Sequence, residues 1–210
     1  MQAPLTGHQV EEVTLAIGEW LGIQEKRVAA SLVVLGYAAR LVGPAVAVLL
    51  RDGILLDLRP AQVEVSFRPG QGFGLALAEP RAWRGPQEAV RLRWSQVVLD
   101  EHLAPLISTV RHVAPLAHQL LWGNVASGLA GALRALASDG SVSPTVAHGT
   151  GEFLLERGWL AGTGHLSLRR DQLHFIRRSC CLYYRIPGGG YCGDCPLSSS
   201  GRSAESGPIS

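Results

Sequence analysis

This 210-residue sequence has few charged residues and almost no lysine. Charged residues make up 17% of the chain and the formal net charge is +2, which argues against a nucleic-acid surface or a polybasic membrane anchor. Lysine occurs once, as Lys26, so nearly every cation is the planar, permanently charged guanidinium of an arginine. Apolar residues make up 47%, which argues against disorder over most of the length. The chain is long enough for one domain with a hydrophobic core.

Common targeting and catalytic motifs are also missing. The N-terminus has no basic segment followed by an apolar one, so no signal peptide is predicted. The glycines at 70, 72 and 74 lie between two predicted strands, which indicates a turn and not a phosphate-binding loop. The histidines show no H-x-x-x-H or H-E-x-x-H spacing, and His118 is expected to be a packed histidine. No dinucleotide-binding motif appears either, so we expect no flavin or nicotinamide site in this chain.

The longest apolar run, residues 28–50, has the length of a membrane span. Arg40 lies near its centre and Pro44 interrupts it, and both disfavour insertion into a bilayer. We expect two buried helices instead, at 27–41 and 44–51, with Pro44 in the first turn of the second. No transmembrane segment is predicted, and the protein is expected in the cytoplasm, where thiols stay reduced.

Hydrophobic periodicity predicts an α+β fold with a mostly helical body. Further helices are expected at residues 8–21, 88–113 (with a break or fresh start at Pro105), 115–137 and 143–158. Short apolar or alternating runs predict a small antiparallel β-meander at 54–58, 63–68 and 73–78. A C-terminal β-hairpin, 166–169 with 172–177, is expected to lead into the cysteine loop. We expect one domain over 1–196, with a cluster-binding segment at 177–196 and a disordered Ser/Gly-rich tail at 197–210.

All four cysteines lie within the sixteen residues from 180 to 195. They are Cys180, Cys181, Cys192 and Cys195. Four clustered thiols in a chain with no other cysteine are typical of a metal site, because soft thiolates select iron–sulfur clusters, zinc or copper(I). The second pair forms a C-x-x-C chelate, in which Gly193 allows a tight backbone turn.

The adjacent pair Cys180-Cys181 favours a broad metal group. Neighbouring side chains of an extended strand point to opposite faces, so two adjacent cysteines do not easily bind one small tetrahedral ion. The four outer thiolate positions of a 2Fe–2S cluster are spread over two irons. The sequence therefore favours a 2Fe–2S cluster, with a single zinc ion and two disulfides as alternatives.

The segment 177–196 closely resembles the C-terminal signature of the FhuF-like ferric-siderophore reductases, whose motif is C-C-x10-C-x2-C. The sequence Leu-Trp-Gly-Asn at 121–124 is similar to a feature of that family upstream. The resemblance implies that the four cysteines bind a 2Fe–2S cluster and that the protein is an oxidoreductase. Its expected reaction is one-electron reduction of iron(III) in ferric-siderophores, with release of iron(II) and no catalytic residue beyond the cluster ligands. An external ferredoxin or flavin/NAD(P)H reductase would supply the electrons. The alternative is a non-catalytic siderophore-binding or accessory protein with a structural zinc or a sensing cluster.

Five candidate substrate-binding residues lie outside the ligand set: Arg177, Arg178, Arg185, Trp122 and Asn124. The arginines near the cysteines, with Arg169 and Arg170, could attract an anionic ferric-siderophore or an acidic donor, or could compensate the negative charge of the cluster. Trp122 and Asn124 could line the substrate face. A tryptophan in a helix more often belongs to the core, and Asn124 could instead cap a buried backbone group.

Overall fold

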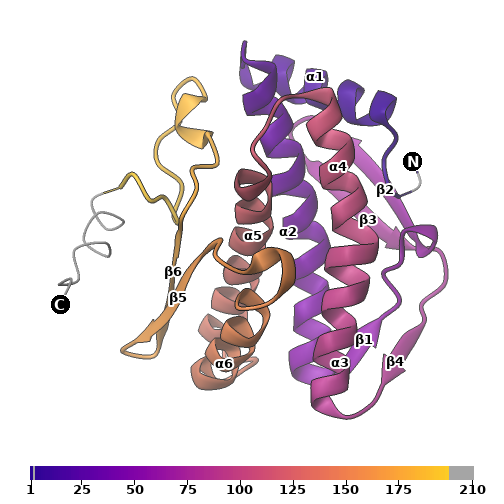
Figure 1. Cartoon of the computed structure of the whole chain (residues 1–210), viewed down its shortest axis with the longest axis vertical. Helices are drawn as coiled ribbons and strands as arrows, with labels where there is room; N and C mark the ends of the chain where they lie inside the picture. The colour runs from indigo at the N-terminus through magenta and orange to yellow at the C-terminus, as the bar shows by residue number, and fades with distance from the viewer. Residues whose placement is uncertain (2, 199–210) are drawn as a thin grey trace.

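The computed structural model describes residue 1 and residues 3–198 (Figure 1). Residues 199–210, most of the predicted tail, lie outside this part of the chain. A mostly helical body carries small antiparallel sheets, which confirms the predicted α+β class. The α-helices are α1 Gly7–Leu21, α2 Lys26–Asp52, α3 Gln87–Trp94, α4 Ala104–Val113, α5 His118–Ser138 and α6 Pro144–Leu155. The strands are β1 Ile54–Leu56, β2 Val63–Arg68, β3 Gly72–Leu77, β4 Ala82–Arg84, β5 Gly164–Arg169 and β6 Gln172–Arg177.

Helices α2 and α5 form the centre of the fold and pack side by side (Figure 1). Their backbones approach closely at Gly128 of α5, where an added Cβ would lie only 3.3 Å from the backbone of Ala39 in α2. Helix α1 and strands β1 and β3 pack on α2, whereas α6 and β6 pack on α5. The β5–β6 hairpin therefore lies on one side of the helices and the other strands lie on the opposite side.

Helix α1 shows how local sequence sets the element boundaries. The Thr6 side chain accepts a hydrogen bond from the backbone N–H of Gln9, and the Gln9 side-chain oxygen accepts one from the backbone N–H of Thr6, which forms a capping box. Gly22 ends the helix in the left-handed region with φ +64°. The buried face carries Val10 and Ile17, which pack in the core.

Helix α2 is continuous, so the prediction of two helices at 27–41 and 44–51 is wrong. Pro44 lies inside the helix, where a missing N–H and a ring clash cost about 3 kcal/mol. Residues on both sides of it are fully or almost fully buried, including Leu41 and Val46. Burying one such side chain contributes about 1.5–3 kcal/mol, so continued packing against the core offsets the cost of the proline.

The same helix is long and apolar enough to cross a membrane by length and composition. Half of its most apolar window is nevertheless buried inside the structure. Because α1 and α5 cover α2 on two sides, its apolar residues fit the expectation of a core helix.

The first strands form two separate ladders, so the three-stranded meander is also wrong. Strand β2 pairs with β3, as predicted, from Val63↔Leu77 to Arg68↔Gly72. Strand β1 pairs with β4, which the sequence analysis did not predict. Between β1 and β2, Leu58 is buried and its carbonyl lies 2.5 Å from Nδ1 of His102. This contact anchors the connection in the core.

The predicted helix at 88–113 contains a π-helical stretch, Ser95–Leu103, between α3 and α4. His102 in this stretch is fully buried, and its Nε2 lies 2.6 Å from the hydroxyl of Tyr37. Because the Leu58 carbonyl can only accept, Nδ1 of His102 donates to it and Nε2 accepts from Tyr37. Burial lowers the pKa of His102, so the ring is neutral in the folded chain.

The β5–β6 hairpin is confirmed. Its register runs from Gly164↔Arg177 to Arg169↔Gln172. Arg170 and Asp171 form the turn with φ +49° and +58°, the backbone geometry of a tight two-residue hairpin. The open end of the hairpin lies against α5 and carries the chain into the cysteine segment.

Candidate metal centre

Strand β6 leads directly into the first cysteine pair. Cys180 and Cys181 follow its last residue by three and four positions. Leu182 then adopts φ +69°, and this left-handed conformation turns the chain into the short helical turn Tyr183–Arg185. The hydroxyl of Ser31 in α2 donates to the carbonyl of Cys181 at 2.9 Å. The first pair is therefore fixed to the central helix.

The second cysteine pair returns to the end of the same strand. The backbone N–H of Arg177 donates to the carbonyl of Asp194 at 3.1 Å. The Asp194 carboxylate, 8% exposed, accepts from Nη1 of Arg134 in α5 at 2.7 Å. The loop between Cys192 and Cys195 is thus held by β6 on one side and by α5 on the other.

The four cysteines are free thiols, which argues against the alternative of two disulfides. Cys181 and Cys195 are 2% and 3% exposed, and Cys180 and Cys192 are partly exposed. The backbone N–H groups of residues 182 and 197 donate to the sulfurs of Cys180 and Cys195 at 3.3 and 3.4 Å. Within the described residues, 1 and 3–198, no three side chains of Cys, His, Asp or Glu lie close enough together to hold a single metal ion.

One sulfur from each pair is in contact with a sulfur of the other pair. A hydrogen bond with the Cys192 thiol lowers the pKa of Cys181 to about 6. The same bond raises the pKa of Cys192, because the proton is shared between the two sulfurs. Burial raises the pKa of Cys180. A metal that binds these sulfurs must displace their protons.

Arg177 is a buried cation beside these sulfurs. Its side chain is 1% exposed, and its charge favours the thiolate forms of Cys180, Cys181 and Cys192. Its Nε has no hydrogen-bond partner among the described residues, and none of their carboxylates forms an ion pair with it. A buried charge is costly unless an anion balances it. A group of thiolates would supply that anion.

The residues therefore fit a thiolate-bound metal group such as a 2Fe–2S cluster. Four soft sulfur donors lie within residues 180–195, two of them receive backbone N–H bonds, and a buried guanidinium acts electrostatically on three of them. N–H···S bonds and nearby charge are the features that tune iron–sulfur sites.

Trp122 lies in an aromatic cluster on α5 and is 1% exposed. Its ring stacks on Trp159, with centroids 5.5 Å apart and planes 5° apart. Its Nε1–H donates to Nε2 of His118 at 2.9 Å. His118 is therefore a packed histidine, as expected. Trp122 lies in the core, which was one of the two positions considered for it.

Asn124 joins three elements at one buried point. Its Nδ2 donates to the backbone carbonyl and the hydroxyl of Ser31 in α2, at 2.8 and 3.0 Å. Its Oδ1 accepts from Nη2 of Arg177 in β6 at 2.8 Å. Of the two roles expected for Asn124, the satisfaction of a buried backbone group is the one observed. Substrate binding by Trp122 and Asn124 stays a prediction.

The five arginines near the cysteines do not form one patch. Arg169 and Arg170 lie at the tip of the hairpin, about 17 Å along the strand from Arg177. Arg178 is exposed beside the cysteine segment, and Arg185 pairs with a glutamate at the start of α2. Only part of the predicted arginine set therefore lies where it could meet a ligand at the cysteines.

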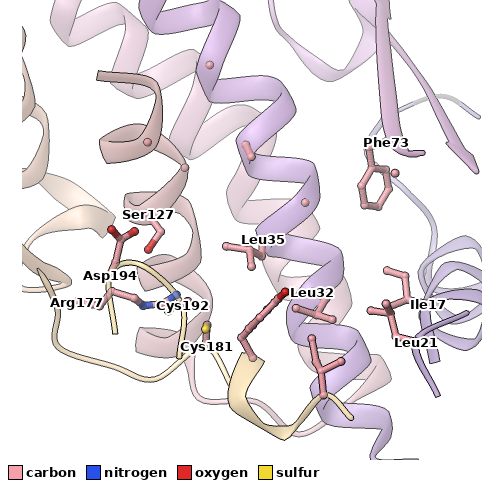
Figure 2. Close-up of a pocket in the computed structure, with 18 of the residues that line it drawn as sticks. Ile17, Leu21, Leu32, Leu35, Phe73, Ser127, Arg177, Cys181, Cys192 and Asp194 are labelled. Atoms are coloured by element: carbon pink, nitrogen blue, oxygen red, sulfur yellow. The ribbon is translucent and has the colours of Figure 1, made fainter. Parts of the chain in front are cut away.

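A cavity of about 640 Å³ lies next to the cysteines (Figure 2). Cys181 and Cys192 line one end of it. Helices α2 and α5 contribute to its lining. Phe73 of β3 and Ile17 of α1 also line it, on the side of α2 that is opposite the cysteines. The cavity therefore connects the candidate metal centre with a largely apolar space.

Sequence reasoning missed the residues that hold the site together. Ser31 and Arg134 are separated from their partners in the cysteine segment by 150 and 60 residues. A serine or an arginine in a helix has no local pattern that marks such a role. Phe73 and the other cavity residues follow ordinary core periodicity, so no signal separates them from the core.

Two family models match the chain. One, described as ferric iron reductase FhuF-like transporter, matches residues 31–169. The other, described as FhuF 2Fe-2S C-terminal domain, matches residues 177–197 and includes all four cysteines. Among curated proteins, none matches the sequence.

Proposed function

The chain belongs to the FhuF-like ferric iron reductase family, and on that premise we propose that it reduces iron(III) in ferric-siderophores by one electron and releases iron(II). Its cofactor is a 2Fe–2S cluster. The observation that carries the proposal is the position of the cysteines: Cys181 and Cys192 lie at the end of a cavity of about 640 Å³. That volume lies in the range of small-molecule sites, roughly 300–1,000 Å³.

The proposed ligands are the four cysteines, Cys180, Cys181, Cys192 and Cys195. When bound, the cluster supplies the single electron. The chain holds the two cysteine pairs in place through Ser31 on α2 and Arg134 on α5. Arg177 balances the negative charge of the thiolates from inside the fold. Four protein thiolates leave no open coordination position, so the ferric-siderophore would be reduced without binding directly to the cluster iron.

One electron is enough to free the metal. Siderophores of the hydroxamate or catecholate type hold iron(III) through hard oxygen donors. Iron(II) is larger and less charged, so the same oxygens bind it far more weakly. The protein therefore needs only to bring the complex close to the cysteine end of the cavity.

An external donor would supply the electrons, because the sequence carries no dinucleotide-binding motif. A ferredoxin or a flavin/NAD(P)H reductase fits this role, and the cytoplasm is the proposed compartment, where the free thiols remain reduced. We also propose that residues 1–196 form a single domain. Arg178 and Arg185 are proposed to bind the substrate.

Anaerobic spectroscopy followed by iron(II) trapping tests the proposal. We expect fresh protein to be red-brown, to bleach with dithionite and to show the paramagnetic signal of a reduced 2Fe–2S cluster. Reduced protein mixed with ferric-siderophores of different chemical types should then yield iron(II), trapped by a coloured chelator. Cys192→Ser should abolish both the visible spectrum and the iron(II) signal. Ser108→Ala, at an exposed position of α4, is the matched control and should change neither.

The rival function predicts the opposite result. A structural-zinc accessory protein would be colourless and hold stoichiometric zinc. A sensing cluster would show the spectrum but transfer no electron to any ferric-siderophore. Either outcome rejects the reductase.

A further inference from the structure

We infer that the cavity beside the cysteines binds a hydrocarbon arm of the iron chelate, so that the preferred substrate is an amphiphilic ferric complex. This inference rests on the proposed reduction of ferric-siderophores and adds the chemical class of the substrate. It is carried by the shape of the cavity, the distribution of polar groups in it, and the exposed aromatic residues at its edge.

The cavity is elongated along α2. Its lining residues on this helix run from Leu32 to Gly43, which corresponds to about 16 Å of helix axis. Only one end of the cavity is lined by Cys181 and Cys192. Figure 2 places Leu35 between the cysteine segment and Phe73. A ligand at the cysteines can therefore extend a chain away from them over α2, toward Phe73.

Polar groups gather at the cysteine end. Figure 2 shows Ser127, Asp194 and Arg177 together beside Cys192. The hydroxyl of Ser127 is buried and has no hydrogen-bond partner in the described part of the chain. Away from this end the walls are mostly apolar and include Ile17, Leu21, Leu32, Leu35, Phe67 and Phe73. The cavity thus matches a molecule with a polar head and an apolar arm.

The apolar walls disfavour a compact, highly charged chelate. Transfer of an ion from water to an apolar surface is strongly unfavourable without a compensating charge. The two charged side chains that line this cavity already have roles. Asp194 pairs with Arg134, and Arg177 is bonded to Asn124. A hydrocarbon arm, by contrast, gains from every methylene that it buries, by up to about fourfold in affinity.

The floor of the cavity has free space for such an arm. A Cβ added at Gly43 of α2 or at Gly131 of α5 would meet no atom within 4 Å. At the edge, Trp20 and Tyr183 line the cavity and are 54% and 39% exposed. Large apolar side chains left exposed around a hollow indicate a surface that a ligand covers.

Binding of redox-inert gallium(III) complexes tests the inference separately from electron transfer. The probes share one tris-hydroxamate chelator whose terminal amine carries an acetyl, hexanoyl or decanoyl group, so the head is constant and uncharged. Binding to the cluster-loaded protein is measured by titration calorimetry below the concentration at which the probes form micelles. We expect the Kd to fall at least tenfold from acetyl to decanoyl.

A cavity-filling variant gives the decisive comparison. Gly131→Leu places a side chain in the free space of the cavity and should remove the chain-length effect while leaving the Kd of the acetyl probe within about twofold. Gly149→Leu is the matched control, because Gly149 is also helical, has open space around its Cβ and lies outside the cavity lining. It should behave as the unmodified protein does.

Two results would overturn the inference. The first is equal Kd values for all three probes, as expected if a protein partner or a second copy covers the cavity. The second is a chain-length effect in Gly131→Leu that equals the effect in the unmodified protein. Iron(II) release from ferric-siderophores without a chain-length effect would reject the hydrocarbon arm and keep the reductase. Chain-dependent gallium binding without iron(II) release would reject the reductase and keep the binding site.

Discussion

Replacement of Arg177 by glutamine tests whether its buried charge balances the metal centre. The side chain is 1% exposed, forms no ion pair with a described carboxylate, and acts electrostatically on three of the four thiols. Glutamine is an amide that can still donate to Asn124, so we expect the fold to be kept. The change removes one positive charge next to the position where the electron is stored.

The magnitude follows from Coulomb's law. Two unit charges that are about 7 Å apart interact by about 2 kcal/mol at an effective dielectric constant of 20, and we take this as the scale for Arg177. For a one-electron couple this corresponds to about 100 mV. Because a positive charge stabilises the reduced state, Arg177→Gln should lower the reduction potential by about that amount.

The assay is a redox titration monitored by visible absorption or paramagnetic resonance. Arg178→Gln is the control, because the neighbouring Arg178 is exposed and water screens its charge, so its shift should stay below about 20 mV. If Arg178→Gln lost iron(II) release with an unchanged potential, Arg178 would act in docking the substrate or donor. An unchanged potential in Arg177→Gln, or equal shifts in both variants, would refute the charge-balance argument.

Three further predictions concern the ligands and the buried polar residues. Cys181→Ser should abolish the 2Fe–2S spectrum and iron(II) release, and a retained spectrum would exclude Cys181 as a ligand. Asn124→Ala removes the buried side-chain hydrogen bonds to Ser31 of α2 and to Arg177, so the free energy of unfolding measured in urea should fall by about 1–3 kcal/mol, whereas Ser127→Ala should change it little. Burial lowers the pKa of His102 in the folded chain. As the pH falls through about 6.5, the unfolded chain therefore binds more protons than the folded chain, and the free energy of unfolding should decline. The urea midpoint should drop between about pH 7.5 and about pH 5.5, and an equal drop in His102→Gln would contradict the assignment to this residue.

Local sequence signals were reliable where a few neighbouring residues determine the structure. The capping box at Thr6, the Ser143 N-cap of α6 and the turn at Arg170-Asp171 each act within four residues, and each marks an element that was predicted. Pro44 misled the analysis because its local cost is certain, whereas the packing that offsets it depends on residues of other helices.

Strand pairing was harder to predict, because pairing is a contact between distant segments. Strand β1 ends at Leu56 and finds its partner at Ala82, after β2 and β3 have paired with each other. The short apolar run at 54–58 fits a meander equally well. The partner of β1 therefore follows from contacts between distant segments, such as the bond between Leu58 and His102, 44 residues apart.

The sequence by itself determined the α+β class, the hairpin before the cysteines, and a clustered set of thiols typical of a metal site, since these depend on periodicity, turn residues and spacing. The tertiary structure decided which residues surround those thiols. It buried Arg177 beside them, tied Asp194 to Arg134, and opened an apolar cavity at Cys181 and Cys192. These features arise where α2, α5 and β6 meet, and contacts across 53 to 150 residues leave no local pattern in the chain.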